Sequence, residues 1–400
     1  MTELPWRSPG RPIVRLLIAV ALTSAVPAAF GVTIGAPLLI GSNSSMLLDE
    51  ISGLVDSRTN ANTFWVHNDS GDPARFFAMS YAGALLGTFS LDGAPLGDWE
   101  DIAMGPKAGG GNYLYLGDIG DNDAERTFVT VYRTAEPQST ADATIPAESY
   151  TAVHLQYPGG PRDAESMFID PVDNELYVIT KRTSPLQIYS APTSVFENPG
   201  QTVMLTARGT VGGPFRWATG ADISSDGRFV LVRSSLFPNG YLFERGAGQS
   251  AADALHGDGI PFTLGTESQG EAIGWAADGK SFFTTSELDG FPSAPIYSYA
   301  FTAPALLPGD YNNDHRVDAA DYTVWRNQMG AQVALPNEIE TLGVVTAEDY
   351  DVWRAHFGES SDGGAAIAPS AGAAVVPEPA TLMLVVMAAC AVGLVARHGT

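Results

Sequence analysis

The chain has 400 residues and a formal net charge of -24, with 21 basic residues against 45 acidic ones. Binding to phosphate backbones requires clustered Lys and Arg, so this balance argues against a nucleic-acid partner and suits calcium or simple solubility. The 43 glycines, 27 prolines and 10% aromatic residues favour strands joined by turns, and a single cysteine excludes a disulfide framework.

The first 31 residues have the order of a secretory signal peptide. Three arginines precede the apolar run 16–26, and small residues follow it up to Gly31. An N-terminal membrane anchor stays the alternative, although the apolar run is shorter than the ~20 residues that a membrane-spanning helix needs. We therefore expect the rest of the chain to be exported.

An acid just ahead of an aliphatic residue recurs five times within residues 32–302. Each acid leads into a short apolar strand, a polar turn and a second apolar strand, which is a hairpin signal. A period of roughly 50 to 65 residues with several strands per unit predicts the blades of a β-propeller. The repeated acids are Glu50, Glu100, Glu165, Asp222 and Glu271.

The number of blades follows from the strands expected in each unit. The first unit has strands at 50–55, 63–67, 75–81 and 84–91, and the second has strands at 100–104, 113–117, 127–133 and 150–157. The fifth unit lacks a clear fourth strand, and the isolated strand 32–40 can supply it and close the ring. We predict five blades. Six blades stay the alternative, because the interval from Glu100 to Glu165 is long.

Acids at the heads of inner strands are expected to face the central channel at one mouth. The loops between second and third strands reach the same face. So many carboxylates cannot all stay ionised without a cation or protons between them, and Ca2+ prefers oxygen ligands. The expected binding residues are Glu50, Asp69, Glu100, Asp101, Asp118, Glu165, Lys181, Arg182, Asp222, Arg233 and Glu271.

Three interpretations of this mouth stay open. The acids accept backbone hydrogen bonds and join the blades, or they bind calcium without catalysis, or they form a hydrolytic site. In the third case the protein is a metal-dependent ester hydrolase with Glu100, Glu165 and His67 as catalytic candidates. Packing between blades is favoured over a carbohydrate platform for four tryptophans, Trp65, Trp99, Trp217 and Trp275.

Three stretches of the propeller region resemble a phytase-like propeller family with esterase-type activity. They are Glu50-Ile51-Ser52-Gly53-Leu54, Asp69 after the second strand, and Asp98-Trp99-Glu100-Asp101. The resemblance covers most of residues 45–300 and implies calcium-dependent hydrolysis of phosphate or carboxylate esters. The loops at 67–69 and 118–123 are longer and more acidic than expected for that family.

From residue 309 the pattern changes to a loop followed by a helix, and this unit occurs twice. Oxygen ligands fall at positions 1, 3, 5, 9 and 12 of a twelve-residue loop, with a carbonyl at position 7, which is calcium-loop spacing. The helix at 321–326 is repeated 28 residues later at 349–354. The expected metal ligands are Asp310, Asn312, Asp314, Arg316, Asp318 and Asp321.

The duplicated loop and helix resemble a type I dockerin over residues 309–358, which implies a Ca2+-binding module that docks onto a cohesin-like partner. His315 stands where the loop usually has Gly, so we expect backbone strain there. Leu342 removes a ligand from the second loop, where metal binding should be weak. The residue pairs 319–320 and 347–348 lack the paired hydroxyls of cellulosomal dockerins, so docking onto a cohesin-like or surface polysaccharide partner is a hypothesis.

The chain ends with Pro377-Glu378-Pro379, an apolar run at 380–396 and a basic stop at Arg397. This order resembles the PEP-CTERM sorting signal of exported bacterial surface proteins. The resemblance implies an exosortase-type partner enzyme and a C-terminal transmembrane helix that anchors the chain before cleavage. An ordinary tail anchor stays the alternative. Either way, the body is expected in the cell envelope or outside the cell.

The sequence thus predicts an all-β propeller followed by a small EF-hand-like helical module and a sorting helix. The predicted segments are a signal peptide at 1–31, the propeller at 32–302, a linker at 303–308, the dockerin-like domain at 309–358, a linker at 359–375 and the sorting signal at 376–400. The favoured function is an exported binding or scaffolding protein of the surface or matrix. A calcium-dependent hydrolase is the alternative, and an accessory role in polysaccharide breakdown is a weaker one.

Overall fold

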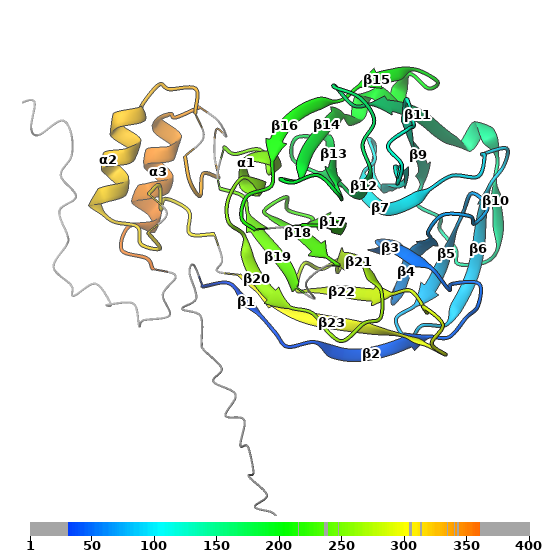
Figure 1. Ribbon diagram of the computed structural model, residues 1–400. Coiled ribbons are helices and arrows are strands. Elements are labelled where there is room, and N and C mark those ends of the chain that lie inside the picture. The colour runs from blue at the N-terminus through cyan, green and yellow to red at the C-terminus, as the bar shows by residue number, and fades with distance from the viewer. Residues whose placement is uncertain are drawn as a thin grey trace, which may run out of the picture.

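The computed structural model describes residues 31–360, except positions 215, 236–238, 247, 304–305, 313, 334, 340 and 342–343. Five sheets stand in a ring around a common centre (Figure 1), which confirms the five-bladed β-propeller and excludes six blades. The predicted signal peptide and the sorting tail lie outside the described residues. Within the described residues, no helix has both the length and the apolar character needed to cross a membrane.

Blades 1 to 4 are each built on four neighbouring antiparallel strands that follow one another from the centre of the ring outward. Blade 1 contains β3 (Ile51–Asp56), β4 (Thr63–Asn68), β5 (Arg75–Ser80) and β6 (Leu85–Leu91). Blade 2 contains β7 (Trp99–Pro106), β8 (Asn112–Asp118), β9 (Val129–Ala135) and β11 (Tyr150–Gln156). Blade 3 contains β12 (Ala164–Asp170), β13 (Glu175–Thr180), β14 (Gln187–Pro192) and β16 (Thr206–Thr210). Blade 4 contains β17 (Ala218–Ile223), β18 (Phe229–Ser234), β19 (Asn239–Glu244) and β20 (Ile260–Thr263).

Blade 5 joins the two ends of the propeller. Its inner strands are β21 (Gly270–Trp275), β22 (Ser281–Ser286) and β23 (Ala294–Thr302), and its outer edge comes from β1 (Thr33–Ile34) and β2 (Leu38–Asn43). β2 pairs antiparallel with β23, from Leu38 opposite Ser298 to Asn43 opposite Ala294. The prediction that an N-terminal strand closes the ring is therefore confirmed.

The long interval between Glu100 and Glu165 contains an extra strand and no extra blade. After β9 the chain crosses to blade 1, where β10 (Ala143–Ile145) pairs parallel with β6, and it returns through the 3-10 helix η2 (Ala147–Ser149) to β11. On this crossing, Glu136 accepts hydrogen bonds from Ser57 Oγ at 2.7 Å and Trp65 Nε1 at 3.2 Å. The excursion thereby ties blade 2 to blade 1.

Smaller elements complete the outer rim. β15 (Thr202–Met204) adds a parallel strand to β11, and η3 (Thr193–Glu197) follows β14. The short helix α1 (Ala251–Leu255) lies between β19 and β20. Apolar side chains fill the space between neighbouring blades, and packing there is confirmed for Trp65, Trp99 and Trp275, which are buried. Trp217 differs, because it is 42% exposed.

Two helices follow the propeller and form an internally repeated unit. They are α2 (Ala319–Gln328) and α3 (Ala347–His356). Trp325 Nε1 on α2 donates to the carbonyl of Thr346, just before α3, at 2.6 Å. Trp353 Nε1 on α3 donates to the carbonyl of Asp318, just before α2, at 2.7 Å. Each helix thus contacts the segment just before the other, as a sequence duplication would produce, and α2 and α3 contain the stretches 321–326 and 349–354.

Candidate metal centre

Every inner strand of the propeller carries a register shift after its first residue. Such a β-bulge leaves one residue unpaired, bends the strand and re-aims the side chain at that position. In blades 1 to 5 the bulged residues are Ser52, Glu100, Glu165, Thr219 and Glu271. Three equivalent strand heads therefore present a glutamate at the same end of the ring, which we call the mouth.

Glu50 and Asp222 do not share this position, so the prediction that all five repeated acids begin the inner strands is wrong for these two. Glu50 lies one residue before β3, and Asp222 is the fifth residue of β17. Asp222 accepts hydrogen bonds from the backbone N–H of Trp275 at 2.7 Å and of Ile223 at 2.9 Å. Its carboxylate therefore joins blade 4 to blade 5 and does not reach the mouth.

Carboxylates meet at the mouth in three overlapping groups. In each group, one oxygen of every member lies within 4.8 Å of the others. Asp69 belongs to the first two groups and Glu100 to the last two, so the groups form one continuous row, which we call the acid row. The groups are Asp69, Glu271 and Glu287, then Asp69, Asp98 and Glu100, then Glu100, Asp163 and Glu165.

Burial and mutual repulsion disfavour the charged forms of these carboxyls. Burial, followed by the nearby Glu165 charge, raises the pKa of Glu100 well above its ordinary value and the pKa of Glu271 to about 8. Burial also raises the pKa of Glu165 to about 7, although Lys181 opposes the shift. Burial and Asp69 raise the pKa of Asp98 to about 6. Close carboxyls of this kind retain protons near neutral pH unless a cation replaces them.

Three buried carboxylate oxygens of the acid row have no hydrogen-bond partner among the described residues. One is Oε2 of Glu165, the least exposed of the three residues at 3%, whose other oxygen contacts Lys181 Nζ. Asp98 Oδ1 and Glu271 Oε2 are also without a partner in this part of the chain. Buried polar atoms are nearly always satisfied in folded proteins. The free oxygens therefore suit a bound cation, and hard cations such as Ca2+ take oxygen ligands.

Three basic side chains lie beside the acid row, and each pairs with an acid. Lys181 contacts Glu165. Arg182 Nη1 lies 2.6 Å from Asp163 Oδ2. Arg126 Nη1 lies 2.7 Å from Asp118 Oδ1, and that same oxygen accepts the backbone N–H of Asp98. Asp118 thus positions Asp98 for the row.

The predicted binding residue Arg233 lies inside the protein instead. It pairs with Glu267 and donates to the carbonyl of Ala272 at 3.1 Å and of Thr285 at 3.3 Å. Both the guanidinium and its carboxylate partner are buried. Arg233 therefore fastens blade 4 to blade 5 and is not free to hold a ligand.

Asp101 follows Glu100 directly but has a structural role. Its carboxylate accepts hydrogen bonds from the backbone N–H of Ile102 at 2.9 Å, Met167 at 2.7 Å and Ala221 at 3.2 Å. This single side chain ties together the inner strands of blades 2, 3 and 4. The architectural interpretation therefore holds for Asp101, whereas its neighbour Glu100 belongs to the acid row.

The catalytic candidate His67 is also buried. Its Nδ1 lies 2.9 Å from the carbonyl oxygen of Asn68, and its ring packs edge-on against Trp99. Burial lowers the pKa of His67 to about 4, so the imidazole is neutral near pH 7. Because it has no exposed surface, His67 has no path to a substrate at the mouth.

Sequence reasoning did not select three members of the acid row as binding residues. Asp98 and Asp163 each precede an inner strand, and Glu287 follows the second strand of blade 5. The prediction that the loops carrying these three acids lie at the mouth agrees with the structure. The signal that could have found them is an acid immediately before the first residue of the inner strand, which blades 2 and 3 share.

The six predicted calcium ligands of the helical module lie on the loop before α2 and on the first turn of α2. Asp310 accepts the backbone N–H of Asp314 at 3.1 Å and of His315 at 2.9 Å, and Asp321 accepts that of Asn312 at 3.0 Å. His315 has a φ of +68°, which agrees with the strain expected at a position that favours Gly. Among the described residues, the close acidic groups lie at the propeller mouth, and this loop does not form one.

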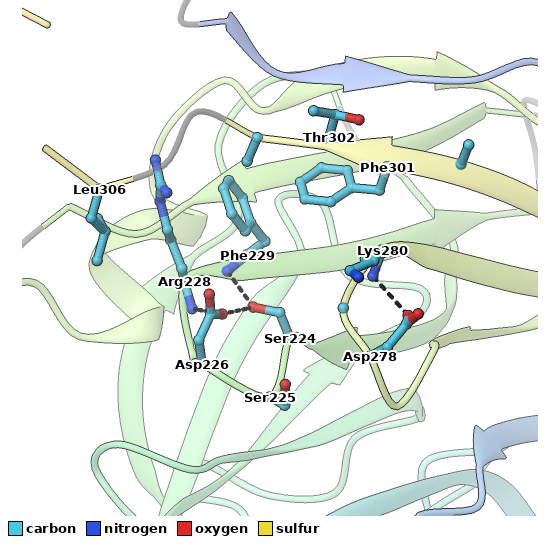
Figure 2. A pocket seen from close by; sticks show the side chains of 13 residues that line it. Ser224, Ser225, Asp226, Arg228, Phe229, Asp278, Lys280, Phe301, Thr302 and Leu306 are labelled. Atoms are coloured by element: carbon cyan, nitrogen blue, oxygen red, sulfur yellow. Dashed lines mark hydrogen bonds between the residues drawn. The ribbon is translucent and has the colours of Figure 1, made fainter. Parts of the chain in front are cut away.

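A groove of about 690 Å³ lies at the other end of the inner strands, beside the hairpin turns of blades 4 and 5 (Figure 2). Its acids are used within their own turns, because Asp226 accepts the backbone N–H of Arg228 at 3.0 Å and Asp278 that of Lys280 at 2.9 Å. The groove is therefore a surface depression between turns, remote from the acid row.

No protein-family model matches the chain, and no curated protein sequence matches it. Among the solved structures that are similar to the chain, three examples have low identity and low TM-scores. A luciferin-regenerating enzyme has 10% identity and a TM-score of 0.40 over 68% of this chain and 95% of that chain. The WD40 repeats of RRP9 have 11% identity and a TM-score of 0.37 over 68% of this chain and 100% of that chain. Kuenenia stuttgartiensis hydrazine synthase has 14% identity and a TM-score of 0.32 over 61% of this chain and 57% of that chain.

Proposed function

We propose that the propeller binds divalent cations, with calcium as the natural guest, at the acid row. The observation that carries the proposal is the set of three overlapping groups of carboxylates at the mouth. Asp69 and Glu100 each belong to two of these groups, and Glu165, whose Oε2 is unpartnered, belongs to the third. The donors are all oxygen atoms, which suit a hard cation better than zinc or copper. Each shared carboxylate has two oxygens and is able to bridge two ions, so the row has room for more than one.

In this proposal the propeller is the binding body of an exported protein of the cell surface or matrix. Export, sorting by an exosortase-type enzyme and a calcium-binding loop in the helical module complete the proposal on the basis of the predicted terminal segments and loop. Extracellular calcium modules bind with dissociation constants of about 10⁻⁴ to 10⁻³ M, because calcium is abundant outside the cell. We expect the acid row to bind in that range.

Calorimetric titration of the whole chain with calcium tests the proposal. The Asp310→Ala and Asp321→Ala substitutions, present in every sample, remove the contribution of the helical loop. Glu100→Gln should then abolish the remaining binding heat, because Glu100 belongs to two of the three carboxylate groups. Glu148→Gln is the matched control, since Glu148 is an exposed acid of η2 at the outer rim. A folded protein that gives no calcium heat before the Glu100 change would refute the proposal.

A calcium-dependent ester hydrolase is the second candidate, for one specific reason. Lys181 and Arg182 lie directly beside Glu165 and Asp163, so an anionic group bound to a cation there would meet two positive charges. Release of p-nitrophenol from its phosphate and acetate esters, with and without calcium, is the assay. Turnover that Glu100→Gln removes supports this candidate. Calcium binding without turnover would refute the hydrolase candidate and leave cation binding as the only function of the site.

A further inference from the structure

Blade 4 differs from blades 2 and 3 at the mouth, because its strand head carries no acid. The residue immediately before each inner strand is, in blades 1 to 5, Glu50, Asp98, Asp163, Trp217 and Gln269. The bulged residue of blade 4 is Thr219, where three other blades have glutamate. Blade 4 therefore places an indole and a hydroxyl at the two positions where blades 2 and 3 place carboxylates.

The backbone of Trp217 is held in an unfavourable conformation. Its φ is +56°, in the left-handed region that bulky side chains avoid. Such a conformation costs about 1–3 kcal/mol and persists where the surrounding structure enforces it, often at functional sites. Two hydrogen bonds enforce it here, from the N–H of Ser235 to the carbonyl of Trp217 at 3.1 Å and from Ser234 Oγ to the carbonyl of Arg216 at 2.6 Å.

The side chain of Trp217 is exposed, and its position just before β17 corresponds to that of Asp98 and Asp163 of the acid row in blades 2 and 3. It is 42% exposed, whereas Trp65, Trp99 and Trp275 are buried between blades. Two residues further on, Thr219 Oγ1 donates to the carbonyl of Gly270 at 3.5 Å, so this strand head lies against that of blade 5, next to Glu271. Blade 4 thus places an exposed indole at the head of its inner strand, at the end of the ring where the acid row lies.

We propose that the mouth binds a sugar ring, whose apolar face packs on Trp217 while its hydroxyl oxygens complete the coordination of the cation in the acid row. The proposal rests on the proposed cation site. A sugar joins the two required features, because its C–H face buries apolar area against an aromatic ring and its neighbouring hydroxyls are hard oxygen ligands. The purely apolar alternative, an acyl chain, uses the indole without any oxygen on the cation.

The test is calorimetric titration of the calcium-loaded whole chain with the methyl glycosides of glucose, galactose, mannose and glucuronic acid. Every sample, including the one called wild type, again carries Asp310→Ala and Asp321→Ala, so that calcium heat reports on the acid row. Trp217→Ala should weaken binding roughly tenfold or more, since the packing of aromatic surface is lost. Phe291→Ala is the matched control, because Phe291 is another exposed aromatic residue of the propeller, 58% exposed. Removal of calcium with EDTA should abolish sugar binding in all three proteins.

The results separate this proposal from the one on which it rests. Calcium heat must persist in Trp217→Ala, because Trp217 offers no ligand to the ion, and circular dichroism checks that the fold is kept. If the wild-type chain binds calcium but none of the glycosides, or if Trp217→Ala binds them as the wild type does, the sugar site is refuted and the cation site stands. If the wild-type chain binds no calcium, both proposals are overturned.

Discussion

Glu165→Gln is expected to stabilise the metal-free protein while it weakens the metal site. Glu165 is buried in the third carboxylate group of the acid row with Glu100 and Asp163. Burial raises the pKa of Glu165 from 4.5 to about 7, a value that already includes the attraction of Lys181. Without metal, the protein therefore loses stability when this carboxyl ionises.

The size and sign of the effect follow from linkage between protonation and folding. A folded-state pKa above the unfolded one contributes stability that is fully present below about pH 4.5 and is lost as the pH rises through about 7. The difference between these two values corresponds to about 3 kcal/mol. Gln carries no charge, so Glu165→Gln should exceed the wild type in stability by about 3 kcal/mol near pH 8 and match it near pH 4. The difference at the higher pH equals roughly 6–12 °C in Tm.

Urea denaturation in EDTA, followed by circular dichroism, measures this difference at the two ends of the pH range. The contributions of the other titrating groups to stability cancel when the wild type is compared with Glu165→Gln. The Glu148→Gln variant controls for the loss of one negative charge at the surface. Excess calcium at pH 8 should reverse the order, because a ligand that binds only the native state stabilises it. A difference between the two proteins that is the same at both pH values would refute the reasoning.

Three further outcomes are expected. Lys181→Met should tighten calcium binding roughly tenfold in calorimetry, because the ammonium group of Lys181 pairs with Glu165 and competes with the ion for this carboxylate. Weaker calcium binding in this variant would show that Lys181 supports the site instead. Asp101→Ala should lower the free energy of unfolding by about 3–6 kcal/mol, because three buried backbone N–H groups lose their acceptor. Asp101→Asn keeps one acceptor oxygen and should lower it less, and equal denaturation midpoints for the two variants would contradict this account. Asp310→Ala should remove the calcium heat that remains in Glu100→Gln, and unchanged heat would place no ion in the helical loop.

The architecture of the propeller could be predicted because it depends on local chemistry. Turns rich in Gly, Asp and Asn alternate with short apolar runs at a steady spacing, and the predicted strands of the first two blades agree with β3 to β9 and β11 to within a few residues. The closure by the N-terminal strand followed from counting, since the fifth unit lacked a partner. The long crossing through β10 was the one feature that a spacing argument could confuse with a sixth blade.

The details of the mouth could not be predicted, because they depend on register. Glu50 and Asp222 directly precede an aliphatic residue and Glu100 stands two residues before one, and only the position of the β-bulge separates the metal candidate Glu100 from the other two. Arg233 belongs to a strand whose end reaches the mouth, but its guanidinium turns inward to Glu267. The exposure of Trp217 depends on a left-handed φ, and no residue pattern in the sequence marks that conformation.

The pairing of β2 with β23 also orders the events of folding. β2 leaves the ribosome before every other strand of the propeller except β1, whereas its partner comes last. Contacts between residues so far apart in the chain form slowly, because the loop-closure entropy must be overcome first. Blades 1 to 4 can therefore assemble while the first strand is still unpaired, and the ring closes in a final step. Until that step, the chain carries two open sheet edges, which makes the unclosed ring the stage most exposed to aggregation.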